Sequence, residues 1–415
     1  MRRKKIKVIH IITHLHVGGA QDNTLLTVER HDRKKIDVTL MCAPDGYWVE
    51  RAQKIPDLRL VFIDKLTRPI HPISDISAFF QIYSHLKKEG YDIVHTHSSK
   101  PGFLGRIAAK MAKVPIVVHT IHGFPFHDFM SPVLRRFFTY LEKQCAKLSD
   151  KMITVSNLNL KKAVQLQIAP AEKFTNIYSG IDFCNFDKKV DCNKKRAELG
   201  IPDDHFIVGM IGRQSKQKSP WNLIKAAPAI LKAHPKTCFV SVGSGELFKD
   251  MQKLVNTMNL SEKFIFLGQR HDIAELLQIF DVYTLPSQWE GLGRSLTEAM
   301  YLKKAIVASD VEGVPELVED GKTGLLVPPN NPALLAESII SLLANQKKRE
   351  QLGANAHNRV KEDFQAAKMV DDIENLYEEC LHGSQGQAVK IDKSNVNGSN
   401  SKGKIIPKTD RIVSQ

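Results

Sequence analysis

Two carboxylates eight positions apart bracket a glycine-containing turn in the segment Glu290-Gly-Leu-Gly-Arg-Ser-Leu-Thr-Glu298. The apolar run Phe280–Leu285 before it is typical of a strand, and a helical pattern over Ser295–Leu302 begins inside it. The unpaired N–H groups at a helix N-terminus suit a phosphate. We expect Glu290 in the loop that faces the ligand. Glu298 lies in the helix, where a carboxylate can accept two hydrogen bonds from a diol such as ribose. An ordinary helix start with acidic residues in its first turns would show the same pattern.

Two cations mark another strand end. Gly212-Arg213 follows the apolar run Phe206–Ile211, and Lys218 comes five residues after Arg213. Arginine, with its planar fork, and lysine, as a point charge, can neutralise a diphosphate without Mg²⁺. The sequence has no Asp-x-Asp pair, the usual anchor for a metal-bound sugar nucleotide. We therefore expect neither a metal ion nor a cofactor. Solvated loop charges are the alternative for Arg213 and Lys218 taken singly.

Length and composition indicate a globular protein with more than one domain. The chain has 415 residues, of which 42% are hydrophobic and 25% charged. No run of 18 apolar residues occurs, so no membrane-spanning helix is predicted. The basic and apolar N-terminus is interrupted by His10, His14 and His16, so we interpret it as a first strand and expect a cytoplasmic protein. Six cysteines without a Cys-x-x-Cys pair fit a reducing compartment.

The positive charge is concentrated in the first half. Residues 1–190 contain 30 Lys and Arg against 17 Asp and Glu, a net charge of +13. Residues 191–382 carry −3 and residues 383–415 carry +4. A basic first half indicates contact with an anionic surface or substrate. Because no aromatic-studded basic stripe or recognition motif is present, we expect an anionic membrane surface rather than nucleic acid.

Short apolar runs alternate with helical stretches along both halves of the chain. The predicted strands of the first half are Lys7–Ile12, Asp37–Cys42, Leu58–Ile63, Asp92–His95, Ile116–His119, Met152–Val155 and Phe174–Ile177. After the polar stretch Asp182–Asp204, those of the second half are Phe206–Ile211, Cys238–Val242, Phe264–Leu267, Val282–Leu285 and Ile306–Ala308. Such strands, separated by helices such as Ile76–Lys88 and Leu104–Lys113, predict parallel sheets covered on both faces. The expected fold class is α/β, with two Rossmann-like doubly wound domains facing across a cleft.

Six short motifs occur in an order that resembles a known family. They are Gly18-Gly19-Ala20, Val118-His119-Thr120-Ile121-His122-Gly123-Phe124, Gly212-Arg213-x4-Lys218, Phe266-Leu267-Gly268-x-Arg270-x-Asp272-Ile273, Glu290-x7-Glu298 and Gly313-Val314-Pro315-Glu316-Leu317-Val318. Together they resemble the retaining glycosyltransferases of family 4, which have the GT-B architecture. The resemblance covers about residues 5–380. It implies a domain 1–190 on the acceptor side, a nucleotide-sugar domain 191–364, and a helix 365–382 that crosses back to the first domain. The remainder, 383–415, is predicted to be a disordered basic tail.

The resemblance also implies roles for single residues. Arg213 and Lys218 would hold the diphosphate, and Glu298 the ribose hydroxyls. His122 and Glu290 are the expected catalytic residues. Further expected contacts to the donor are Gly19 near the diphosphate and the backbone of Gly291, Leu292, Gly293 and Arg294 around the sugar. Two residues depart from the family pattern, because Ser219 and Glu312 stand where many members have glycine.

The predicted function is therefore transfer of a hexose or an N-acetylhexosamine, with retention and without a metal ion. The donor would be a nucleotide sugar, a UDP-sugar in the first place, and the acceptor a hydroxyl of a glycan or a polyprenyl-linked glycan. Alternatives are a nucleotide-sugar epimerase of the same fold and a transferase acting on a small soluble acceptor. The Thr120-x-His122 and Glu290-x7-Glu298 motifs argue against the epimerase.

Two further features of the first half could bind a ligand or a membrane. Eight histidines lie at predicted strand ends, which suggests one shared crevice: His10, His14, His16, His95, His97, His119, His122 and His127. They could bind a metal, bind substrate, or pair locally in the core. The helix predicted over Pro132–Leu148 has an apolar face containing Leu134, Phe137, Phe138, Leu141, Cys145 and Leu148. Its opposite face carries Arg135, Arg136, Lys143 and Lys147. That face is either solvated or bound to anionic lipid, which would place the enzyme peripherally on the cytoplasmic membrane face.

Overall fold

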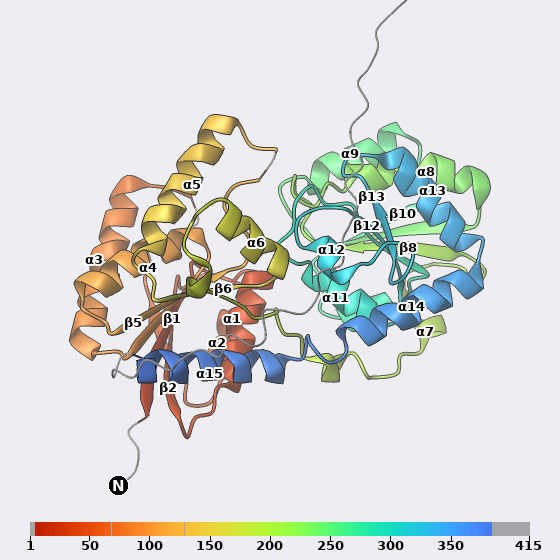
Figure 1. Cartoon of the computed structure of the whole chain (residues 1–415). Helices are drawn as coiled ribbons and strands as arrows, with labels where there is room; N and C mark the ends of the chain where they lie inside the picture. The colour runs from red at the N-terminus through yellow and green to blue at the C-terminus, as the bar shows by residue number, and fades with distance from the viewer. Residues whose placement is uncertain (1–4, 68, 128, 384–415) are drawn as a thin grey trace, which may run out of the picture.

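Two parallel β-sheets, each covered by helices, form the two lobes of the computed structural model (Figure 1). The structure describes residues 5–67, 69–127 and 129–383. The predicted α/β class with two Rossmann-like domains is confirmed. The predicted disordered tail falls almost wholly on residues 384–415, which lie outside the described residues.

The first sheet has seven strands in the order β3-β2-β1-β4-β5-β6-β7. They are β1 (Ile6–Ile11), β2 (Ile36–Cys42), β3 (Arg59–Phe62), β4 (Ile93–His97), β5 (Ile116–Ile121), β6 (Lys151–Thr154) and β7 (Phe174–Asn176). The strand order reverses between β1 and β4, where doubly wound sheets open a crevice at the carboxyl ends of their strands. His10 and His95 are direct neighbours across this point.

The second sheet has six strands in the order β10-β9-β8-β11-β12-β13. They are β8 (Phe206–Ile211), β9 (Thr237–Val242), β10 (Phe264–Gly268), β11 (Val282–Leu285), β12 (Ala305–Ser309) and β13 (Leu325–Val327). Strand β13 is not among the strands predicted from the sequence. The other strands lie within a few residues of the predicted bounds.

The helices of the first half alternate with its strands along the chain. They are α1 (Gly19–Arg30), α2 (Val49–Gln53), α3 (Pro72–Glu89), α4 (Ser99–Met111), α5 (Pro132–Ala146) and α6 (Asn157–Gln165). Helix α4 starts five residues before its predicted start at Leu104. Its early turns contain Pro101, which is tolerated in a first turn because the N–H it lacks would have no helical partner.

The helices of the second half end in one that returns to the first lobe. They are α7 (Cys192–Glu198), α8 (Trp221–Ala233), α9 (Phe248–Thr257), α10 (Ile273–Ile279), α11 (Arg294–Tyr301), α12 (Val314–Leu317), α13 (Pro332–Leu343), α14 (Gln346–Val360) and α15 (Ala366–Gly383). Helix α15 runs beneath the first lobe in Figure 1 and buries Ile373, Leu376 and Tyr377 in the core around β1. Helix α15 thus contributes to the core of the first lobe.

Candidate functional site

A cleft between the two lobes is lined by the ends of strands from both sheets. All of the predicted site residues line it, namely Gly19, His122, Arg213, Lys218, Glu290, Gly291, Leu292, Gly293, Arg294 and Glu298. They converge because His122 directly follows β5, Arg213 follows β8, and Glu290 follows β11. The carboxyl ends of parallel strands meet at one edge of a sheet, and here two such edges face each other.

The glycine turn after β11 brings the two lobes into direct contact. A Cβ atom on Gly291 would lie 2.2 Å from the carbonyl oxygen of His122. The carbonyl of Gly291 accepts a hydrogen bond of 2.9 Å from Nδ2 of Asn159, on α6. Gly293 has φ of 99° and precedes α11 directly. Glycine suits both positions, because Gly291 lies very close to the opposite lobe and Gly293 has left-handed backbone.

Lys218 and Glu290 form a largely buried ion pair in the wall of the cleft. Nζ of Lys218 lies 2.5 Å from Oε1 of Glu290, which also accepts a hydrogen bond of 2.7 Å from the Ser287 hydroxyl. The lysine stem lies over Gly212, where a Cβ atom would be 3.2 Å from Cε. Arg213 extends from the same strand end and donates to Gln217. A diphosphate entering here would compete with Glu290 for the Lys218 ammonium.

Glu298 lies on the first turns of α11, with its carboxyl turned into the cleft wall. Burial, together with the nearby carboxylate of Asp22, raises the pKa of Glu298 to about 7, although Arg294 and Lys218 oppose this rise. Such a carboxyl changes its charge near neutral pH. Its ability to accept two hydrogen bonds from a diol therefore depends on pH.

The side chain of Arg294 connects the two lobes. Its guanidinium lies 2.5 Å from Asp22 of α1 and 3.2 Å from Glu298, and it donates to the carbonyl of Gly180 at 2.8 Å. The sequence predicts only the backbone of Arg294 at the site, and Asp22 is not among the predicted site residues. An acidic residue in the first turn of a helix is common for dipole reasons alone, so the sequence carried no specific signal for this pair.

His122 stands on the opposite wall of the cleft. Its Nε2 atom lies 3.2 Å from Nδ1 of His97. Burial lowers the pKa of His122 to about 4, so the ring is neutral at physiological pH. It can exchange hydrogen bonds with a sugar but does not supply a positive charge to a phosphate.

The two residues that depart from the family pattern both have left-handed backbone. The φ angle is 47° at Ser219 and 41° at Glu312. This conformation favours glycine and explains why glycine is common at both positions in the family. Ser219 donates to the carbonyl of Lys216 at 3.0 Å, and Glu312 pairs with Lys162 at 2.8 Å. The Glu312 carboxylate is therefore directed to α6.

Helix α5 differs from the simple picture of an apolar face packed on the sheet. Cys145 is buried, and Phe138 and Leu141 are half-buried. By contrast, Leu134 and Phe137 near the N-terminal end are about half exposed, at 49% and 53%. Periodicity alone predicted one continuous buried face, but burial increases toward its C-terminal part. In the described part of the chain, no helix is long and apolar enough to cross a membrane.

Comparison with known proteins identifies the chain. The model of "Glycosyltransferase Family 4" matches residues 17–183, and that of "Glycosyl transferases group 1" matches residues 191–359. An Escherichia coli protein named UDP-Gal:alpha-D-GlcNAc-diphosphoundecaprenol alpha-1,3-galactosyltransferase is 32% identical over 377 residues, 90% of this chain and 97% of that protein. The chain belongs to glycosyltransferase family 4. The predicted family and enzyme class are confirmed.

Other matches to this family-4 glycosyltransferase agree. The capsular polysaccharide biosynthesis glycosyltransferase CapM of Staphylococcus aureus is 25% identical, with 92% of this chain and all of that protein covered. Anabaena HepE in complex with UDP and glucose has a TM-score of 0.78 at 22% identity, covering 90% of this chain and 100% of HepE. The lipopolysaccharide glycosyltransferase WaaG has a TM-score of 0.71 at 15% identity and covers 89% of this chain. These solved structures share the fold, which is GT-B.

Proposed function

We propose that this enzyme transfers a hexose or N-acetylhexosamine from a UDP-sugar to a hydroxyl of a lipid-linked glycan, with retention and without a metal ion. One observation carries the proposal: Arg213, Lys218 and the start of α11 converge on a single cleft that also contains Glu298. Two cations and a helix N-terminus are a sufficient set of partners for a diphosphate. The 32% identical relative, which is named for transfer of galactose to a diphosphoundecaprenol-linked sugar, makes UDP-galactose the first donor to test.

The chemistry follows from where charge develops. Breaking the bond between the anomeric carbon and the diphosphate leaves negative charge on the phosphate. Arg213 and Lys218 stabilise that charge, as do the N–H groups that follow Gly293. The acceptor hydroxyl then attacks from the same face and passes its proton to the leaving phosphate. When the diphosphate forms an ion pair with Lys218, the Lys218–Glu290 pair is broken, and Glu290 can accept hydrogen bonds from the sugar. His122 supports the sugar from the other lobe.

The surface around α5 supports an acceptor held at an anionic membrane. Val133, Leu134, Phe137 and Tyr140 are exposed apolar side chains on this helix, and Arg135 and Arg136 lie between them. In Figure 1, α5 stands at the top of the first lobe. Apolar side chains can enter the headgroup region, while each basic residue near anionic lipid contributes about 1 kcal/mol.

The activity test uses purified enzyme with UDP-sugars and a GlcNAc-diphosphopolyprenol acceptor. Released UDP and a lengthened, alpha-linked glycolipid are the expected products. A new UDP-sugar formed without acceptor would instead indicate an epimerase, and transfer to a free sugar alone would indicate a soluble acceptor. Lys218→Ala should lower the transfer rate, because it loses a diphosphate contact, and Lys249→Ala, at an exposed lysine of the second lobe, is the matched control.

Membrane binding is tested by sedimentation with vesicles. A chain ending near His382 removes the confounding charge of residues 383–415. It should bind anionic vesicles at low salt, bind neutral ones weakly, and dissociate as salt screens exposed charges beyond about 8 Å. Binding should fall when four basic residues are changed to Gln, namely Arg135, Arg136, Lys143 and Lys147. It should persist when four exposed lysines of the second lobe are changed instead, namely Lys249, Lys253, Lys322 and Lys347. Failure of this shortened chain to sediment with anionic vesicles at low salt would contradict the proposed membrane binding.

A further inference from the structure

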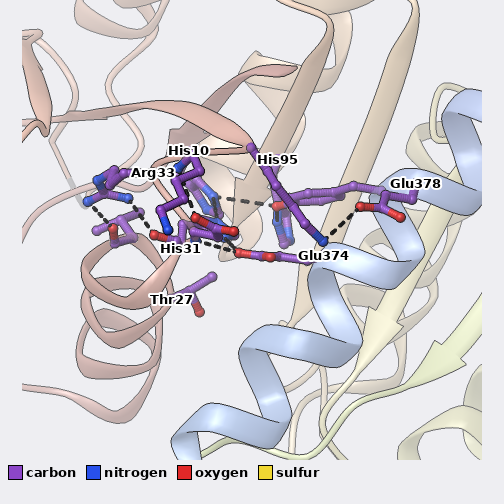
Figure 2. Close-up of polar contacts among 12 residues, drawn as sticks. His10, Thr27, His31, Arg33, His95, Glu374 and Glu378 are labelled. Carbon is purple, nitrogen blue, oxygen red and sulfur yellow. Dashed lines mark hydrogen bonds and ion pairs between the residues drawn. The ribbon is translucent and has the colours of Figure 1, made fainter. Parts of the chain in front are cut away.

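Four histidines and a glutamate form a continuous chain of hydrogen bonds through the first lobe. Oε1 of Glu374, on α15, lies 2.9 Å from Nδ1 of His31. Nε2 of His31 lies 3.1 Å from Nε2 of His10, and Nδ1 of His10 lies 2.9 Å from Nε2 of His97. Nδ1 of His97 lies 3.2 Å from Nε2 of His122, which lines the cleft. Figure 2 shows the inner end of this chain, where Glu374 extends from α15 towards His31.

All four imidazole rings are held neutral. Burial lowers the pKa of His10, His31 and His97, and repulsion from neighbouring histidines adds to the effect for His10 and His97. The guanidinium of Arg33 also lowers the pKa of His10 and His31. His122 has a pKa of about 4. A neutral imidazole has one N–H donor and one acceptor nitrogen, so every ring in the chain must donate on one side and accept on the other.

The glutamate fixes the direction of the chain. Burial opposes the ionisation of Glu374, but hydrogen bonds from His31 and from the backbone N–H of Asp32 at 2.9 Å prevail and lower its pKa. An ionised carboxylate only accepts hydrogen bonds. His31 therefore donates from Nδ1, which leaves its Nε2 as an acceptor. Each following ring must donate to the one before it, so His122 donates from Nε2 to His97 and keeps a lone pair on Nδ1.

A side branch agrees with this direction. The hydroxyl of Tyr377 lies 2.5 Å from Nδ1 of His95 and 3.4 Å from Nε2 of His10. It can donate to His95 while its oxygen accepts from His10. Nε2 of His95 then donates to Thr120 at 2.7 Å. The ring nitrogens of His10, His95 and His97 lie close enough to hold a metal ion, but each one already has a hydrogen-bond partner. A cation would have to break several of these bonds.

We propose that Glu374, acting through His31, His10 and His97, sets the tautomer of His122 so that its Nδ1 lone pair accepts a hydrogen bond from a hydroxyl of the transferred sugar. This inference rests on the proposed function. Among the described residues, the His122 ring forms a hydrogen bond only through Nε2, and the ring lines the cleft. His31, His10, His97 and Glu374 are positioning residues in this scheme. Helix α15 would thereby influence which sugar hydroxyl pattern the first lobe accepts.

The tautomer is measured directly by ¹⁵N NMR on protein with labelled histidines. The His122 signals are assigned by their loss in the His122→Asn variant. In the unaltered enzyme, Nε2 of His122 should give the protonated, pyrrole-type shift and Nδ1 the unprotonated, pyridine-type shift from pH 6 to 8. The reverse assignment overturns the proposal, as does stoichiometric zinc bound by the purified protein. This test does not depend on transfer activity, so its failure is distinguishable from failure of the proposed function.

Kinetics with donors that each lack one hydroxyl test the consequence. With the unaltered enzyme, kcat/KM for one of these donors should be about 2- to 12-fold lower than for the full UDP-sugar, which is the effect of one neutral hydrogen bond. Glu374→Leu removes the carboxylate that accepts from His31. It should abolish the difference in kcat/KM between the full donor and the donor that lacks the hydroxyl, and NMR should show a mixture of His122 tautomers. Glu374→Gln keeps an acceptor oxygen and should retain most of the difference in kcat/KM between these two donors. The control His85→Gln, a histidine of α3 outside the chain, should behave like the unaltered enzyme. An unchanged penalty in Glu374→Leu contradicts the proposal.

Discussion

Replacing Gly291 with alanine should separate donor binding from transfer. A Cβ atom at this position would lie 2.2 Å from the carbonyl oxygen of His122 and 3.1 Å from its carbonyl carbon. Because Gly291 does not have left-handed backbone, alanine itself fits the local conformation. The clash is therefore with the opposite lobe. An ordinary contact of this kind needs about 3.2 Å, so the two walls of the cleft must move apart by roughly 1 Å.

A displacement of about 1 Å at reacting groups costs about 100-fold in rate. We expect kcat for Gly291→Ala to fall by about that factor. Arg213, Lys218 and Glu298 all belong to the second lobe, so the Kd for UDP should change by less than about threefold. The assays are steady-state transfer and calorimetric UDP binding. Gly383→Ala is the matched control, because a Cβ there meets nothing within 4 Å. The reasoning would be refuted if Gly291→Ala had the kcat of the unaltered enzyme, or if its Kd for UDP rose by the same factor by which kcat fell.

The other predictions concern the donor site. Arg213→Ala should lower kcat/KM by about 10- to 150-fold through loss of a charge-assisted contact of about 1.5–3 kcal/mol, and Arg213→Lys should be intermediate because the charge remains without the fork. For Glu298, whose pKa is about 7, the KM for the donor should rise as the pH falls from 8 to 6, because protonation removes an acceptor for the ribose hydroxyls. Glu298→Gln should flatten this pH dependence, and a flat profile in the unaltered enzyme would contradict the assignment. Gly19→Ala should leave the melting temperature unchanged, since its Cβ would lie 3.8 Å from Arg294, and should raise the donor KM if the diphosphate approaches Gly19.

The sequence predicted the parts of the site that depend on local pattern. His122, Arg213 and Glu290 each follow an apolar run, and parallel strands bring such positions to one edge. The contacts between the lobes carry no local pattern. Asp22 meets Arg294 only because of how the lobes are arranged, and the partner of His31 is 343 residues away at Glu374.

Two other features depend on what lies around an element rather than on its own residues. The periodicity of α5 predicted an apolar face but could not show that about half of the Phe137 side chain stays exposed. The histidines at strand ends were expected to share a crevice, and His10, His95 and His97 do lie together. Their hydrogen-bond partners required the structure, because each ring nitrogen can pair with any nearby donor or acceptor.

Transfer measured in excess EDTA tests the central claim most directly. The account assigns charge neutralisation at the leaving diphosphate to Arg213, Lys218 and the start of α11, with no metal ion involved. Purified enzyme with UDP-galactose and the diphosphopolyprenol-linked acceptor should release UDP and form product at the same rate with and without EDTA. Activity that disappears in EDTA and returns with Mg²⁺ or Mn²⁺ would contradict the account.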